Sequence, residues 1–110
     1  MRSPSQIKAE IEERLKKYLS KDKTGLRRAV LELFVRKSTL TVKDVFEKIS
    51  EKFKTSYNSI ASMVGTIASR LGILHTKKDL DNQLTVYELK ERYRDLVLKI
   101  LDYYPKPEGS

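Results

Sequence analysis

The chain has 110 residues, of which 35% are charged and 39% hydrophobic, and its formal net charge is +8 at pH 7. This length fits one domain with one modest core, and no apolar run approaches the roughly 20 residues that cross a bilayer. The N-terminus lacks the continuous apolar stretch of a secretory signal. We therefore expect a cytoplasmic protein whose basic excess suits a polyanionic partner.

Residue types that build most catalytic and metal sites are missing. There is no cysteine, and His75 is the only histidine, which excludes thiolate metal sites and any strong form of a Ser-His-Asp triad. No glycine-rich phosphate loop occurs. The acidic pairs Glu12 with Glu13, and Asp79 with Asp81, fall in segments expected to be solvated, where catalytic pKa values are not favoured. We expect neither an enzyme nor a bound metal or cofactor.

A first helix is predicted from Pro4 to about Ser20. Ser3, Pro4 and Gln6 form the pattern of an N-cap, a proline at the first helical position and a capping box. Apolar residues then recur at three- and four-residue spacing, which indicates one buried stripe.

The next segments continue the helical pattern after a polar break. A second helix is predicted over 26–37, and a short extended connector over 38–40. Thr41 followed by Asp44 repeats the capping pattern and begins a third helix, which is predicted to end near Lys54.

A fourth helix is predicted over 57–71. Thr55 and Ser56 precede it as caps, and Gly72 is the left-handed residue that ends it. Because so tight a turn joins it to the third helix, the pair is typical of a helix-turn-helix, whose second member can present its outer face.

The sequence changes period after the fourth helix. Segments 73–76 and 84–88 are rich in β-forming residues, and the polar segment 77–83 between them is typical of a hairpin turn. Thr85 and Glu88 are also compatible with a capping box that starts the last helix early, so two interpretations remain open here.

A final helix is predicted from about Leu89 to Tyr104, where Pro105 ends it. Residues 1–104 are predicted to form one domain, and 105–110 a disordered tail. The fold class predicted from the pattern is mainly α with a small β-hairpin.

This order of elements resembles that of winged helix-turn-helix proteins of archaea and bacteria. The resemblance rests on "SRLGIL" at 69–74, which leads through the hairpin to "VYEL" at 86–89. The segment from Met1 to Leu101 is similar to a family of short archaeal winged-helix proteins of unassigned function. The resemblance implies a winged helix-turn-helix with extra N- and C-terminal helices, although this fold also serves for protein docking.

The resemblance places helix 57–71 in the major groove of double-stranded DNA and hairpin 73–88 as the wing. A helical wheel predicts that base and phosphate contacts come from a small polar face and its edge: Asn58, Ser59, Ser62, Thr66, Ser69 and Arg70. Further phosphate contacts are expected from basic residues outside this face: Lys54, Lys77, Lys78, Arg27, Arg28 and, as a further candidate, Lys43. These residues predict a transcriptional regulator, and the alternative is a protein-interaction module that uses the same face.

The first and last helices suggest self-association. The last helix has a broad apolar face, and Leu98 lies opposite it, which exceeds what one core contact requires. We predict a homodimer whose interface comprises Ile7, Ile11, Leu15, Tyr93, Leu98, Leu101 and Tyr104. A two-fold dimer would place two recognition helices about one DNA turn apart. The alternative is that both helices only complete the core of one chain.

Overall fold

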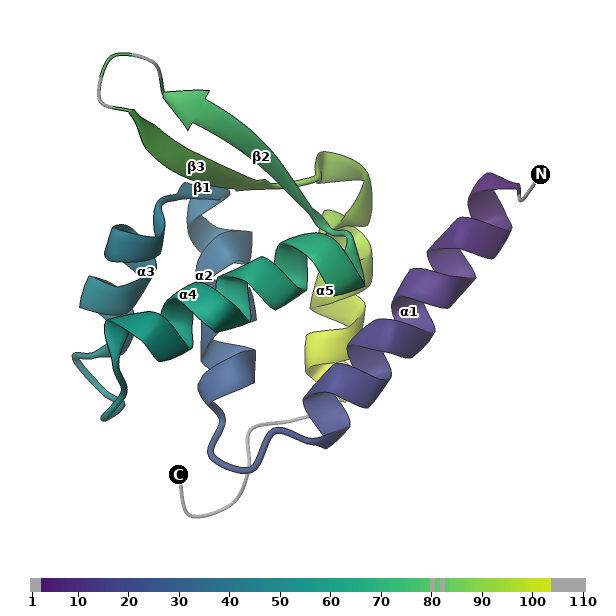
Figure 1. Ribbon diagram of the computed structural model, residues 1–110. Coiled ribbons are helices and arrows are strands. Elements are labelled where there is room, and N and C mark those ends of the chain that lie inside the picture. Colours follow the sequence, from purple (N-terminus) through teal and green to yellow (C-terminus); the bar gives the residue numbers. More distant parts are fainter. Residues whose placement is uncertain (1–2, 80, 82, 104–110) are drawn as a thin grey trace.

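The computed structural model describes residues 3–79, 81 and 83–103. It is mainly helical, with one small antiparallel sheet (Figure 1). In chain order the elements are α1 Pro4–Ser20, α2 Leu26–Lys37, β1 Thr39–Leu40, α3 Val42–Ile49, α4 Tyr57–Thr66, the π-helical turn η1 Ile67–Leu71, β2 Leu74–Asp79, β3 Leu84–Leu89 and α5 Glu91–Tyr103. The mainly α prediction is confirmed, and Tyr104 and the tail lie outside the described residues.

Two helices begin with the capping boxes that the sequence predicts. At α1, the Ser3 hydroxyl accepts from the Gln6 amide at 3.2 Å, and the Gln6 side chain accepts from the Ser3 amide at 2.9 Å. At α3, Thr41 and Asp44 form the same reciprocal pair, at 3.1 and 3.0 Å. These local bonds satisfy amides that have no partner inside the helix.

The predicted end of the third helix is wrong. The helix ends at Ile49, and residues 50–56 form a longer connection to α4 instead of a tight turn. The carbonyl oxygen of Ile49 accepts from the amides of Lys52 and Phe53, at 3.0 and 2.9 Å. The apolar pattern continues to Phe53 because this side chain packs against the core from outside the helix.

The fourth helix has the predicted bounds but changes its winding. The Ser56 hydroxyl accepts from the Ser59 amide at 3.1 Å, which caps α4. The Gly72 amide donates to the Ile67 carbonyl at 3.1 Å, and Gly72 has a left-handed φ of 72°. The wider final turn keeps both Ile67 and Leu71 buried.

The sheet has strand order β1-β3-β2, with both pairs antiparallel. The hairpin register runs from Leu74 opposite Leu89 to Asp79 opposite Leu84. The connector predicted over 38–40 is in part a strand, because Thr39 pairs with Glu88 and so adds β1 to the edge of β3.

Two predictions at the hairpin are corrected. The turn predicted over 77–83 is shorter, because β2 continues to Asp79. The outer part of the hairpin is exposed, so its residues lack the apolar alternation that marks a half-buried strand. Thr85 and Glu88 lie within β3, which excludes the alternative in which they cap the last helix. That helix starts at Glu91, two residues after the predicted start.

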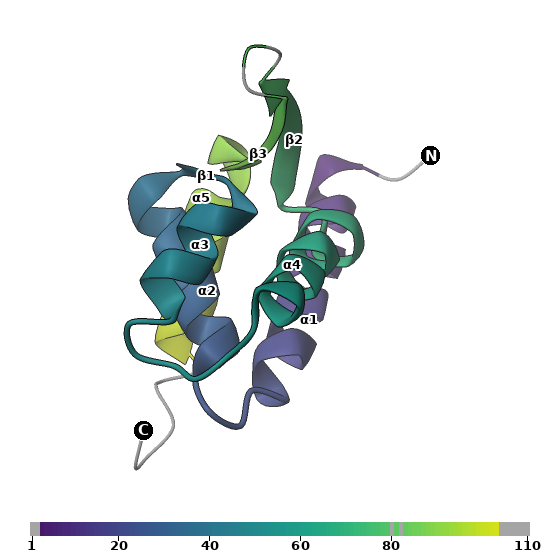
Figure 2. The same ribbon diagram turned by 60° about the vertical axis from the view of Figure 1, so that its left-hand side comes forward.

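The core lies between the helices, where α4 crosses in front of α2 and α1 lies beside α5 (Figures 1 and 2). Cationic side chains bind the C-terminal carbonyls of two helices, where a positive charge is favourable. Arg94 donates to the carbonyl of Val35 in α2 at 2.5 Å, and Arg28 donates to the carbonyl of Leu101 in α5. These two contacts join α2 to α5.

Most of the predicted dimer interface lies inside this core. Ile11, Leu15, Tyr93 and Leu101 are 0 to 7% exposed, because α1 packs on α5 of the same chain. They are therefore unavailable to a partner surface. Ile7 and Leu98 are exposed, and Tyr104 lies outside the described residues.

None of the described helices is long and apolar enough to cross a membrane.

Candidate nucleic-acid interface

The helix α4 and the π-helical turn η1 that continues it bury one stripe and expose the opposite side. Ile60, Val64 and Ile67 are fully buried. The residues predicted to contact DNA lie away from this stripe, and all but the half-buried Thr66 are exposed. No charged residue occurs between Tyr57 and Ser69, so the exposed surface of the helix is small and polar until its last turn.

Two serine hydroxyls, one in α4 and one in η1, already have local hydrogen bonds. The Ser69 hydroxyl donates to the carbonyl of Gly65 at 2.8 Å, and Ser59 accepts from the Ser56 hydroxyl at 3.0 Å. Serine commonly forms such bonds in helices. With its proton engaged, Ser69 can meet a ligand only as an acceptor.

The hairpin separates the two lysines predicted to bind phosphate together. Successive side chains of a strand point to opposite faces, so Lys77 and Lys78 project from different sides of β2. Lys77 Nζ lies 3.1 Å from Glu88 Oε1. This hydrogen bond lowers the pKa of Glu88 below its ordinary value. Lys78 shares a face with Leu74, and Lys54 is exposed in the connection that precedes α4.

Arg27 and Arg28 also diverge, since neighbouring residues of a helix point about 100° apart. Arg28 binds the carbonyl of Leu101, and its Nε lies 2.7 Å from Glu32. Its side chain is 18% exposed and is engaged in contacts within the chain, while its predicted phosphate contact stays a prediction. Arg27 donates to the carbonyl of Tyr18 at 2.8 Å, and its guanidinium lies 4.5 Å from the centre of the Tyr18 ring.

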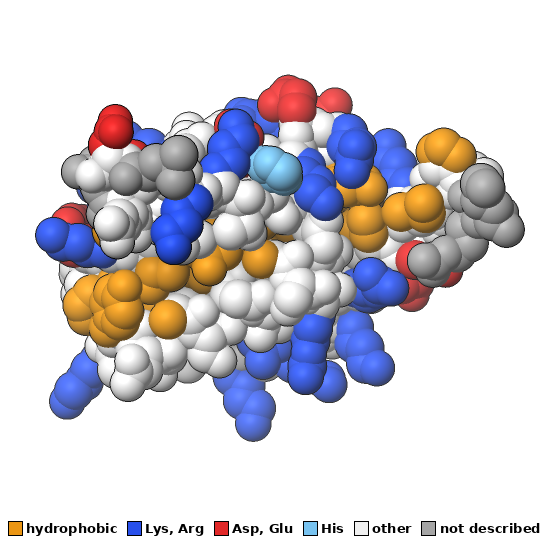
Figure 3. Space-filling view, turned by 45° about the horizontal axis from the view of Figure 1, so that its top comes forward, with side chains coloured by type: hydrophobic (Ala, Val, Ile, Leu, Met, Phe, Trp, Pro, Cys, Tyr) orange, Lys and Arg blue, Asp and Glu red, His pale blue; other side chains and the backbone are white. Residues whose placement is uncertain are grey.

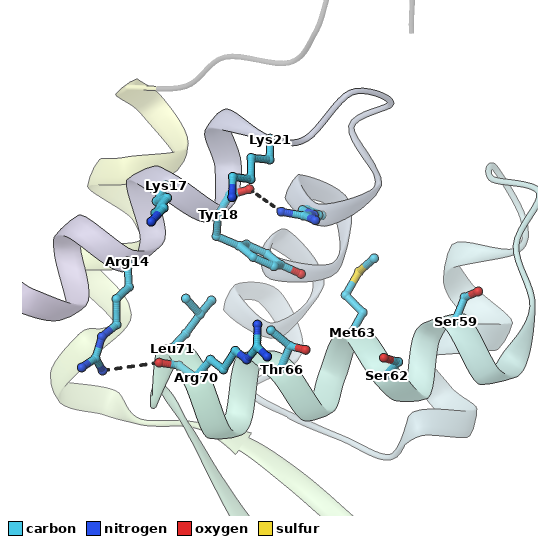
Figure 4. A pocket seen from close by; sticks show the side chains of 11 residues that line it. Arg14, Lys17, Tyr18, Lys21, Ser59, Ser62, Met63, Thr66, Arg70 and Leu71 are labelled. Carbon is cyan, nitrogen blue, oxygen red and sulfur yellow. Dashed lines mark hydrogen bonds between the residues drawn. The ribbon is translucent and has the colours of Figure 1, made fainter.

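Arg27 thereby joins a groove between α1 and α4, which we call the α1–α4 groove (Figure 4). Its volume is about 750 Å³. The residues that line it come from α1 and its C-terminal cap, α2, α4 and η1: Arg14, Lys17, Tyr18, Lys21, Arg27, Ser59, Ser62, Met63, Thr66, Arg70 and Leu71. Of the predicted DNA contacts, the structure brings together here Arg27, Ser59, Ser62, Thr66 and Arg70.

Three basic residues of this groove were missed at the sequence level. Arg14, Lys17 and Lys21 are spaced by three and four positions, which places them on one face of a helix. That spacing is visible in the sequence and could have grouped them. Nothing local indicates that this face of α1 lies beside α4.

The basic side chains of the groove are not neutralised by acidic ones. Within the described part of the chain, none of Arg14, Lys17, Lys21, Arg27 and Arg70 takes part in an ion pair, and no acidic residue lines the groove. Arg14 instead donates to the carbonyl of Arg70 at 3.4 Å. The groove therefore carries a concentrated positive charge.

Another face of α1 is different. Lys16 lies 3.5 Å from Glu12 and 3.8 Å from Glu13, and Lys99 of α5 lies 3.1 Å from Glu12. Hydrogen bonding from Lys99 lowers the pKa of Glu12. On this side of the helix, positive and negative charges alternate and offset one another.

The Tyr18 hydroxyl is a buried donor in the wall of the groove. It has no hydrogen-bond partner among the described residues, and it points toward Met63 of α4 (Figure 4). Burial raises the pKa of Tyr18 to about 12, and the Arg27 charge only partly offsets this effect. The Tyr18 hydroxyl therefore keeps its proton to a higher pH than an ordinary tyrosine.

The surface shows how these groups are distributed. Figure 3 shows a band of uncharged side chains, partly hydrophobic, that crosses one face of the molecule with Lys and Arg side chains on both sides. No group of three or more His, Asp or Glu side chains within the described residues is placed to hold a metal ion.

Comparison with known proteins gives a family. Residues 15–97 match the family described as "Protein of unknown function (DUF2551)". The chain belongs to the DUF2551 family. An uncharacterised protein of Archaeoglobus fulgidus is 37% identical over 99 residues, which make up 89% of this chain and 99% of that protein. No solved structure matches.

The archaeal relative confirms the predicted similarity to short archaeal proteins of unassigned function. The DUF2551 match begins within α1 and ends within α5. It contains α4, the hairpin and every residue of the α1–α4 groove except Arg14.

Proposed function

We propose that this protein is a winged helix-turn-helix DNA-binding protein in which α4 enters the major groove and the β2–β3 hairpin acts as the wing. The order α2, β1, α3, α4, β2, β3 supports this fold. Support also comes from β1, which pairs with the returning strand of the hairpin. In this arrangement α3 and α4 are the helix-turn-helix pair.

The observation that carries the proposal is the uncharged exposed side of α4, which lies between two basic margins. The groove margin consists of the basic residues of the α1–α4 groove, and the hairpin margin consists of Lys77 and Lys78. A major groove about 12 Å wide admits a helix, and small side chains allow the backbone to approach closely. Asn58 has the donor and acceptor that match adenine, and Arg70 suits guanine or phosphate. Lysines such as Lys54 and Lys78 then bind phosphates and release counterions.

Regulation of transcription is part of the proposal, because a domain that occupies a DNA site can block or recruit other proteins there. The proposal also includes a homodimer, but with a smaller interface than the sequence predicts. The exposed Ile7 and Leu98 are the predicted interface residues that can still meet a partner. Sedimentation of a single species of monomer mass at high micromolar concentration would remove the dimer.

A matched pair of variants tests DNA binding. Asn58 and Ser5 are both exposed and both second residues of a helix, where aspartate is favourable. Asn58→Asp places a negative charge on the outer side of α4, and Ser5→Asp places the same charge elsewhere. We expect Asn58→Asp to weaken binding to a selected duplex by about 10- to 100-fold, with little change for Ser5→Asp.

Fluorescence anisotropy with labelled duplex at rising salt gives the measurement, and selection from a random DNA pool supplies the duplex. Affinity of the wild-type chain for random duplex weaker than about 100 μM at low salt, below the usual non-specific range, would refute DNA binding.

A second candidate function is a protein-interaction module. It is favoured by Tyr57, which is 49% exposed at the start of α4 and lies edge-on to Phe46, with ring centroids 5.8 Å apart. Under this hypothesis, changing Arg70, Lys77 and Lys78 to Glu leaves any DNA affinity unchanged, and a pull-down gives a stoichiometric partner. Loss of DNA affinity in that triple variant favours the first function.

A further inference from the structure

The α1–α4 groove has properties that the approach of α4 to DNA does not by itself require. It is formed by residues far apart in the chain, and its volume of about 750 Å³ lies in the range of small-molecule sites, roughly 300 to 1,000 Å³. Part of its lining is apolar, from Met63 and Leu71. A ligand with an organic part attached to a charged group fits this combination.

The charge of the groove specifies the sign of that ligand. Five cationic side chains line it without an acidic one. The nearby Asp22 carboxylate accepts from the amides of Arg27 and Arg28, at 3.1 and 3.0 Å. The adjacent Glu13 pairs with Lys16. Assembling like charges without a counter-charge is unfavourable, and an anion removes that cost.

The donors of the groove specify the type of anion. Guanidinium groups bind phosphate through two parallel hydrogen bonds, and Arg27 is held in place by the Tyr18 carbonyl and ring. Ser62 and Thr66 line the same wall as Arg70 and add hydroxyl donors. A phosphate has more acceptor oxygens than a carboxylate and so can use more of these donors.

The Tyr18 hydroxyl is a further donor at this site. A buried hydroxyl without a partner is unfavourable, and this one faces Met63 across the groove (Figure 4). Met63 is unbranched and flexible, so its rotation can uncover the hydroxyl for a ligand oxygen.

We propose that the α1–α4 groove is a phosphate-binding site, in which Arg14, Lys17, Arg27 and Arg70 hold the phosphate group of a phosphate ester. Two sources supply this group: a free phosphorylated molecule of the nucleotide class, or a backbone phosphate of DNA held on α4. The site rests on its own geometry in the first case and on the proposed function in the second.

Two lysines of α1 provide the matched test. Lys17 lines the groove, whereas Lys8 lies nine residues earlier, which is two and a half turns and places it on the opposite face. Both are exposed, and glutamine removes one charge from either while retaining helix propensity. The variants Lys17→Gln and Lys8→Gln therefore make the same chemical change, one inside the groove and one on the opposite face of α1.

The probes are pyrophosphate and ATP, titrated by calorimetry, and a DNA duplex, titrated by anisotropy. For the probe that occupies the site, we expect Lys17→Gln to weaken binding about 3- to 10-fold more than Lys8→Gln. The double variant Arg14→Gln/Lys17→Gln should weaken it by a further factor of about ten. Thermal unfolding of each variant verifies that the chain is folded.

The outcomes separate the two sources and the two proposals. Binding of ATP or pyrophosphate that depends on Lys17 assigns a free ligand. No such binding up to about 10 mM, with a Lys17-dependent loss of DNA affinity, assigns the DNA backbone. Equal effects of Lys17→Gln and Lys8→Gln on every probe overturn the site while leaving DNA binding by α4 intact. ATP binding without DNA binding supports the site and refutes the proposed function.

Discussion

The two basic margins beside α4 differ in how their charges are used. On the α1 side, five cations line a groove and none of them forms an ion pair within the described residues. On the hairpin side, Lys77 is paired with Glu88, and Lys78 projects from the other face of β2. Under the proposed function, we therefore expect the pairing of charges, more than the number of lysines, to decide which of the two surfaces attracts DNA.

The origin of the difference is geometric. The spacing of Arg14, Lys17 and Lys21 gathers them along one side of α1 and its C-terminal cap. Glu13 lies one turn before Lys17, but both Glu12 and Glu13 pair with Lys16. A strand alternates its faces and brings Lys77 diagonally opposite Glu88. The ion pairs of Glu12 and Glu13 with Lys16 therefore leave the described groove cations without an acidic partner, whereas the hairpin places Lys77 against Glu88.

The largest expected effect compares the two margins directly. The double reversal Lys17→Glu/Lys21→Glu should weaken DNA binding by about 100-fold, because two positive charges that line the groove change sign in an unpaired cluster. Lys77→Glu/Lys78→Glu should weaken it less than about 10-fold, since Lys77 is already offset by Glu88. Anisotropy titrations at two salt concentrations measure both. A larger loss for the hairpin variant would reverse the comparison.

The next effect tests the buried wall of the groove. Because the pKa of Tyr18 is raised to about 12, the unfolded chain loses this proton near pH 10, while the folded chain keeps it until about pH 12. Unfolding therefore releases a proton in this window, and stability falls as pH rises, by about 2 kcal/mol in total. Urea unfolding from pH 9 to pH 12 measures this fall.

Tyr18→Phe is the control for this pH dependence, since it keeps the ring that stacks on Arg27. Its stability should decline less steeply across the same window. An identical decline in the variant and the wild-type chain would show that the hydroxyl is not buried in solution.

A smaller effect is expected for Arg28, which should matter for stability and not for DNA binding. Arg28→Ala removes bonds to the carbonyl of Leu101 and to Glu32, so the free energy of unfolding should fall by about 1 to 2 kcal/mol. DNA affinity should change less than about twofold. Arg36→Ala, at an exposed position of the same helix, serves as the control. A large loss of DNA affinity in a stable Arg28→Ala variant would restore its role as a phosphate contact.

The smallest effect is expected when the acidic partner of Lys77 is neutralised. Glu88→Gln keeps the size of the side chain and removes the charge that offsets Lys77. The hairpin margin then resembles the groove margin more closely, and DNA affinity should rise about two- to threefold at low salt. No change on anisotropy titration would indicate that Lys77 lies away from bound DNA.

Much of the secondary structure follows from signals a few residues long. Ser3 with Gln6 and Thr41 with Asp44 place two helix starts, and Gly72 places one helix end. The predicted end of α3 is wrong because Phe53 packs on the core without being helical. The apolar pattern of the sequence therefore extends beyond the last helical residue. The two-residue strand β1 depends on pairing with β3 and has no local pattern of its own.

The candidate site divides in the same way. The uncharged outer side of α4 can be read from helical periodicity, since it depends only on positions within one helix. The groove depends on α1 lying against η1, where Arg14 meets the carbonyl of Arg70 across 56 residues of chain. Tertiary packing also decided that Arg27 enters the groove while Arg28 binds α5. Local sequence determines which face of an element a side chain occupies, but only the packed chain determines what that face meets.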